Sequence, residues 1–146
     1  MPYVVKEKGL KNVCGLFQDD ELGLEVQKGA TDGLASMGMK LGEVTTYKRG
    51  ATEFSTQIQR LAAAKCDAVV LAAIIRESIG AMAAAKRLSY SPVFFGSVAS
   101  YSELIPKLGG DVVNGLYAAM FIEVPDLNSP SDAIRFWSRK DRKSVV

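Results

Sequence analysis

An uninterrupted apolar run inside DAVVLAAIIRE, from Asp67 to Glu77, places the strongest constraint on the fold. Eight apolar residues, Ala68 to Ile75, follow Asp67, and a charged pair ends the run. A run this short is typical of a strand buried on both faces, as in the centre of a parallel sheet. A buried helix could give the same run, but helical patterns precede and follow it. We therefore predict a central strand.

Strand and helix patterns alternate along the whole chain, with short connections. Besides the central strand, strands are predicted at 12–17, within 39–47, at 93–96 and at 115–122. Helices are predicted at 1–8, from Asp19 or Asp20 to Met37, from a Thr52 cap, at 76–89, after a capping box at 100–103, and from Ser131. Such alternation indicates βαβ units, and right-handed crossovers place helices on both faces. The predicted fold class is α/β, a doubly wound, mostly parallel five-stranded sheet with strand order 2-1-3-4-5.

Composition bounds the classes of protein that the chain can be. Its 146 residues suit one domain, and an apolar fraction of 48% is ample for a core. No apolar run reaches the roughly 18 residues that a membrane span needs, and the charged N-terminus does not read as a signal peptide. The net charge of +2 carries no footprint of a nucleic-acid partner. We expect neither a membrane span nor nucleic-acid binding.

The two cysteines, Cys14 and Cys66, form no CxxC motif, and the chain has no histidine. A zinc site is therefore not expected, and no other cofactor is predicted. The simplest interpretation is two small buried thiols. Both residues would lie near the amino ends of neighbouring strands, so a disulfide is the alternative.

The predicted ligand side of the sheet is formed by the loops at 18–23, 74–77 and 97–102, with 121–124 as a further wall. Open α/β sheets bind ligands at the carboxyl ends of their strands. These loops contain no GxGxxG, Walker A or GxSxG motif and no histidine to act as a base. The central strand ends in Ala73, Ile74 and Ile75, which offer almost no reactive group. We therefore predict a binding lobe rather than an enzyme.

Several residues of these loops have two interpretations each. The carboxylates of Asp19, Asp20 and Glu21 can cap a helix and favour its dipole, or contact a ligand. No capping side chain directly precedes Arg76, so the first N–H groups of that helix are predicted to bind either water or an anionic group of a ligand. Tyr101 can stack on a ligand or cover a short helix.

Three segments carry a resemblance to a known family: QDDELGLEVQKGATDGLASMG, TTYKRGATEFSTQIQRLAAAKCDAVVLAA and LGGDVVNGLYAAM. They resemble the second lobe of type I periplasmic binding proteins, and more closely the leucine/isoleucine/valine-binding branch that serves ABC importers. The likeness runs from about Val4 to Trp137. It implies a two-lobed periplasmic receptor that closes on a small ligand and delivers it to a membrane permease, with the first lobe of the same protein as a partner.

The resemblance also implies which residues contact the ligand. Amino-acid binders of this branch often have tyrosines where this chain has Leu22 and Ile74 or Ile75. They often have an acidic residue, which pairs with the ligand's ammonium group, where this chain has Val98. The missing pairing is expected to cost on the order of 2–5 kcal/mol for a zwitterion, which favours a more apolar or aromatic carboxylate. The predicted ligand-binding residues are Asp20, Leu22, Ile74, Ile75, Ser97, Val98 and Tyr101.

The domain organisation follows from the same resemblance. Residues 1–140 are predicted to form one α/β lobe of a two-lobed protein. Residues 141–146, DRKSVV, resemble a translated sequencing adapter and are predicted to be an artificial tail. The alternative function is a ligand-sensing domain of a transcription regulator or receptor with the same fold, because fold does not determine function. A signal peptide encoded upstream would favour transport, and a helix-turn-helix would favour regulation.

Overall fold

The computed structural model describes residues 1–120 and 128–141 of the chain. Five strands form one parallel sheet in the order β2-β1-β3-β4-β5, which confirms the predicted fold class and strand order. The strands are β1 (Val13–Gln18), β2 (Val44–Tyr47), β3 (Ala68–Ala72), β4 (Val93–Gly96) and β5 (Leu116–Ala118).

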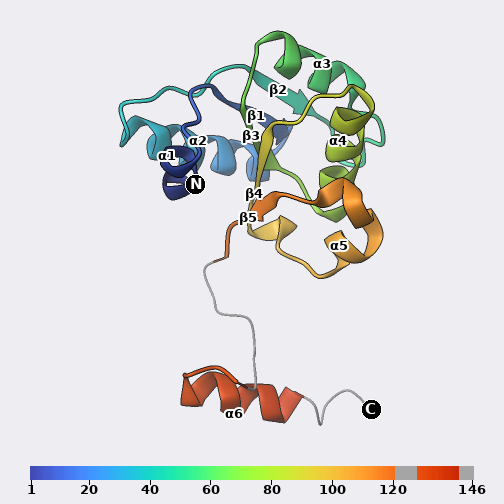
Figure 1. Cartoon of the computed structure of the whole chain (residues 1–146). Helices are drawn as coiled ribbons and strands as arrows, with labels where there is room; N and C mark the ends of the chain where they lie inside the picture. The colour runs from blue at the N-terminus through green and yellow to red at the C-terminus, as the bar shows by residue number, and fades with distance from the viewer. Residues whose placement is uncertain (121–127, 142–146) are drawn as a thin grey trace.

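Helices cover both faces of this sheet (Figure 1). On one face lie α1 (Pro2–Glu7) and α2 (Glu21–Ala35), and on the other lie α3 (Ser55–Ala63), α4 (Ile75–Arg87) and α5 (Leu104–Gly109). Two short 3₁₀ segments, η1 (Val98–Ser100) and η2 (Gly110–Val113), flank α5, and α6 (Asp132–Asp141) follows near the C-terminus. No helix in the described ranges is long and apolar enough to cross a bilayer.

The central strand β3 is buried on both faces, as its apolar run predicts. Successive side chains of a strand point to opposite faces, and here they enter two different cores. Val69 and Leu71 pack with α3, α4 and α5, whereas Ala68, Val70 and Ala72 pack with α1 and α2. All five residues are at most 6% exposed.

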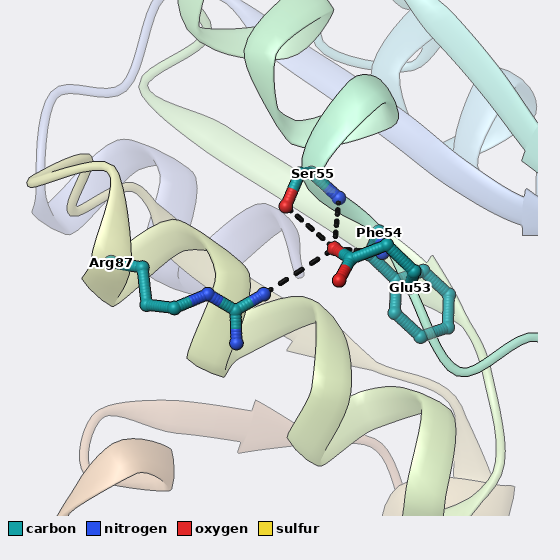
Figure 2. A network of polar contacts seen from close by, with 4 residues as sticks. All are labelled: Glu53, Phe54, Ser55 and Arg87. Atoms are coloured by element: carbon teal, nitrogen blue, oxygen red, sulfur yellow. Dashed lines mark hydrogen bonds and ion pairs between the residues drawn. The ribbon is translucent and has the colours of Figure 1, made fainter.

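The start of α3 corrects the prediction that Thr52 caps this helix. The Glu53 carboxylate accepts hydrogen bonds from the N–H groups of Phe54 and Ser55, both at 2.9 Å, and from the Ser55 hydroxyl (Figure 2). It also forms an ion pair with Arg87 of α4 at 3.3 Å. The Ser55 hydroxyl and these N–H groups lower the pKa of Glu53. Glu53, rather than Thr52, therefore accepts the hydrogen bonds at the start of α3, and its ion pair links this segment to α4.

The predicted capping box of Ser100 and Glu103 is also wrong. The Ser100 hydroxyl is buried and donates to the carbonyl of Ala73 at 2.9 Å, with the Ser78 hydroxyl 3.0 Å away. Glu103 pairs instead with Lys107, and α5 begins at Leu104. Ser100 thus fastens η1 to the end of β3 and to α4.

Other boundaries differ by a few residues. α2 ends at Ala35 rather than Met37, and Gly38 has the predicted left-handed backbone, with φ +72°. β2 occupies only the last part of the predicted 39–47 range. The predicted loop wall at 121–124 lies outside the described residues, as do the end of the predicted fifth strand and residues 142–146 of the predicted tail.

The two cysteines form a disulfide, Cys14–Cys66, with Cα atoms 5.8 Å apart. The interpretation as two buried thiols is therefore wrong, and the alternative holds. Cys14 is the second residue of β1, and Cys66 lies two residues before the start of β3, the strand that pairs with β1. The bond joins β1 to the segment entering β3 at the amino ends of the strands, opposite the predicted ligand edge.

Candidate ligand-binding site

The loop after β1 is held by Asp20. This residue is the N-cap of α2, and one carboxylate oxygen accepts the Gly23 N–H at 3.3 Å. The Gln18 side-chain amide donates to the other oxygen. These contacts, the one from Gln18 first, lower the pKa of Asp20. The capping interpretation of Asp20 is confirmed, and Leu22 lies half-buried beside it in the first turn of α2.

The N-terminus of α4 lies at the carboxyl end of the central strand. Its N-cap is Ile74, which makes no side-chain capping bond, and the helix begins at Ile75, one residue earlier than predicted. The prediction that no side chain caps this helix is confirmed. Ile74 and Ile75 are both half-buried. The first backbone N–H groups of a helix have no partner within the helix and carry partial positive charge. They can therefore bind an anion.

The loop after β4 divides in two. Ser97 follows the strand directly, and Val98 opens η1 with 41% of its surface exposed. Tyr101, 44% exposed, instead lines a cavity of about 730 Å³ between η1, α5 and β5. Because β1, β3 and β4 are adjacent, the structure gathers six of the predicted residues along three neighbouring strand ends and sets Tyr101 on the β5 side.

Buried polar side chains at this edge were missed by sequence reasoning, which predicted almost no reactive group at the end of β3. Gln18 is 2% exposed and Glu77, in the first turn of α4, is 1% exposed. Ser78 and Ser100 are buried beside them. The position of Glu77 near the start of a helix without a cap was the only available signal, and it does not distinguish a buried from an exposed carboxylate.

Tyr47 connects the ends of β2 and β3. Its hydroxyl donates to the carbonyl of Ala72 at 2.8 Å, and its ring packs edge-on against Phe54 with centroids 5.2 Å apart. Burial, and then the nearby carboxylates of Glu77 and Asp20, raise the pKa of Tyr47. Tyr47 therefore stays neutral. Among the described residues, no group of three potential ligands could hold a metal ion.

Comparison with known families decides what this arrangement belongs to. The model of a family described as periplasmic binding protein matches residues 1–143. The chain belongs to this family. Its members bind small molecules and work with ABC transporters. No curated protein matches the chain.

Solved structures of periplasmic binding proteins share the type I fold. A substrate-binding periplasmic protein from Ralstonia solanacearum matches 99% of this chain with a TM-score of 0.82 and 21% identity. A branched-chain amino acid ABC transporter protein from Thermus thermophilus, with bound valine, matches 98% with a TM-score of 0.80 and 19% identity. A fatty acid ABC transporter substrate-binding protein from Thermomonospora curvata matches 98% with a TM-score of 0.78 and 18% identity.

The chain spans only part of these proteins. It covers 41% of the Ralstonia chain and 37% of each of the other two. The resemblance to the leucine/isoleucine/valine-type binding proteins is confirmed at the level of family and fold. One of these structures holds valine and another belongs to a fatty acid transporter, so they leave the ligand of this chain open.

Proposed function

We propose that this chain is the second lobe of an ABC importer's substrate-binding protein and holds one side of a small carboxylate ligand. The observation that carries the proposal is the N-terminus of α4, which lacks a side-chain cap at the carboxyl end of the central strand. Its N–H groups suit a carboxylate. Leu22, Ile74, Ile75 and Val98 supply an apolar rim around it. The ligand resembles a branched-chain amino acid or a more apolar or aromatic carboxylate.

In the full-length protein, the two lobes close on the ligand. Contacts that the ligand makes with both lobes at once select the closed state. One lobe supplies only part of these contacts, so this chain alone binds weakly. The same proposal places the full-length protein in the periplasm, with a membrane permease as its further partner.

A charge reversal at the start of α4 tests the carboxylate site. Ile75→Asp places a negative charge at the first helical residue, where it repels an anion and uses the helix dipole itself. We expect the affinity for 4-methylpentanoate and 3-phenylpropanoate, followed by amide chemical shifts, to fall about tenfold. Leu24→Asp, on the exposed face of α2, is the matched control and should leave the affinity unchanged. Equal affinities for wild type and Ile75→Asp would contradict the proposed site.

An exposed apolar face around α5 and β5 fits a lobe that is covered in a longer protein. Large hydrophobic side chains are exposed there: Tyr101 and Met120 line the cavity, and Leu104 and Leu108 lie on α5, each at least 38% exposed. Soluble monomers rarely expose such contiguous apolar surface. We propose that the remainder of the full-length chain covers this face.

If so, the isolated chain should associate through this face. We expect the double variant Leu104→Lys and Leu108→Lys to reduce self-association in sedimentation equilibrium several-fold, because it places charges on the apolar face. Leu24→Lys, which changes a single exposed leucine on α2, serves as the control. A wild-type chain that stays monomeric at high concentration would contradict the assignment of this face.

A further inference from the structure

The two-residue turn before β5 is Asn114–Gly115, an asparagine followed directly by a glycine. Both residues are exposed, and they connect η2 to β5, which lies at the edge of the sheet. The backbone angles, φ −59° and ψ 130° at Asn114 and φ +87° at Gly115, are close to those of a type II turn. An exposed turn therefore holds a side-chain amide next to the backbone nitrogen of a glycine.

These two groups can react with each other. The Gly115 nitrogen attacks the side-chain amide carbon of Asn114 and forms a C–N bond, while the bond from that carbon to the side-chain nitrogen breaks. The proton of the Gly115 N–H leaves with this nitrogen as ammonia, and a five-membered cyclic imide remains. Water then opens the imide at one of its two carbonyls, which gives aspartate or isoaspartate at position 114. Neither step needs an oxidant or a reductant.

Ring closure requires the peptide plane between Asn114 and Gly115 to rotate, so that the nitrogen faces the side chain. Glycine allows this rotation because it adopts positive and negative φ with similar ease. No backbone carbonyl in the described ranges accepts the Gly115 N–H. The Asn114 amide donates a long hydrogen bond, 3.4 Å, to the carboxylate of Asp111. Within the part of the chain that the structure describes, neither reacting group is therefore strongly restrained.

We propose that Asn114 deamidates spontaneously, and faster than the other asparagines of the chain. The other two are followed by Val13 and Ser129, whose Cβ atoms hinder the approach of the backbone nitrogen. The Asn12 amide also donates to two backbone carbonyls, at 2.8 and 3.2 Å. Asp32–Gly33 has a similar sequence but lies inside α2, where helical hydrogen bonding engages the glycine N–H.

The modification weakens β5, because isoaspartate adds one atom to the main chain of the turn. Val113 before the turn is buried and Leu116 after it is half-buried, and both pack in the same core. With a longer link between them, the two side chains cannot both keep their positions. The new carboxylate also lies beside that of Asp111, and like charges repel. Since β5 has three residues and pairs with β4 at the edge of the sheet, it separates more easily than the central strands.

Incubation at mildly alkaline pH, with peptide mapping by mass spectrometry and measurement of the released ammonia, tests the site. We expect deamidation at Asn114 to be about tenfold or more faster than at Asn12 or Asn128, because only Asn114 precedes a glycine. Asn114→Gln should remove the fast ammonia release, since glutamine forms a larger ring more slowly. Asn128→Gln is the matched control and should leave the release unchanged. An isoaspartate-specific carboxyl methyltransferase should label the aged wild type and not the aged Asn114→Gln.

Two results would overturn this site. One is fast ammonia release that persists in Asn114→Gln. The other is a peptide map in which Asn114 stays intact while Asn12 or Asn128 is converted. Neither measurement involves a ligand, so the outcome does not depend on the proposed function.

Urea unfolding of aged protein tests the effect on β5. The aged wild type should have a lower urea midpoint than the aged Asn114→Gln, and the difference should grow with the isoaspartate content. Freshly prepared Asn114→Asp carries the new charge without the extra main-chain atom, so its midpoint should lie between those of the fresh and the aged wild type. Equal midpoints for the fresh and the fully converted wild type would overturn the weakening of β5.

Discussion

Loss of the Cys14–Cys66 disulfide is expected to lower the free energy of unfolding by about 4 kcal/mol. The bond closes a loop with a sequence separation of 52 residues, and the chain-entropy estimate for a loop of this length is roughly 4 kcal/mol. It also joins β1 to the segment that enters β3, the two strands at the centre of the sheet. Breaking it therefore increases the conformational entropy of the unfolded chain over the segment between the two cysteines.

Guanidinium unfolding with and without a thiol reductant measures this effect. The double variant Cys14→Ala and Cys66→Ala lacks the disulfide under every redox condition and serves as the comparison. Under oxidising conditions it should be about 4 kcal/mol less stable than the wild type, and under reducing conditions the two should agree within about 1 kcal/mol. A wild type with the same free energy of unfolding with and without the reductant would contradict the prediction. Because disulfides persist in oxidising compartments such as the periplasm, the bond agrees with the proposed location.

The sheet could be predicted from the sequence because its signals are local. The run from Ala68 to Ile75 requires burial on both faces, and β3 is indeed buried in both cores. The strand at 93–96 was predicted with its observed bounds. Alternating strands and helices, with right-handed crossovers, then leave few topologies, and the order 2-1-3-4-5 is the simplest of them.

The caps could not be predicted because a hydroxyl or carboxylate has several backbone groups within reach. Ser100 could cap a helix, yet it bonds to the carbonyl of Ala73, 27 residues earlier in the chain. Glu53, not Thr52, reaches the first N–H groups of α3. The partner of each side chain depends on which segments the fold brings together, and a local sequence pattern does not contain that information.

The candidate site was predictable in outline and not in its polar content. Leu22, Ile74 and Val98 follow adjacent strands, as the sheet order requires. Glu77 escaped notice because a charged residue after a strand normally faces water. Its burial depends on the packing of α4 against the sheet, which also brings Glu77 near Tyr47 of β2, thirty residues earlier in the sequence. The cysteine pairing was left open for a similar reason, since it depends on how the segment that enters β3 packs beside β1.

Gly23→Ala is expected to destabilise the chain by about 3 kcal/mol, because the turn from β1 into α2 leaves no room for a side chain. A Cβ at position 23 would lie 1.7 Å from the carbonyl oxygen of Gln18. That oxygen belongs to the backbone, so the clash cannot be relieved by rotating a side chain, and overpacking of this kind costs roughly 1–3 kcal/mol or more. The Asp20 cap, which depends on the Gly23 N–H, would be displaced as well.

Gly29→Ala in the same helix is the matched control, since a Cβ there meets nothing within 4 Å. It should stabilise the chain by roughly 0.5–1 kcal/mol, because alanine is the better helix former. Urea unfolding of both variants therefore yields effects of opposite sign from the same substitution. Two variants of equal stability would mean that β1 and α2 do not approach as closely as the structure has them. A shift of this turn would move Gln18 and Leu22 together, so Gly23→Ala should also weaken binding of 4-methylpentanoate, whereas Gly29→Ala should not.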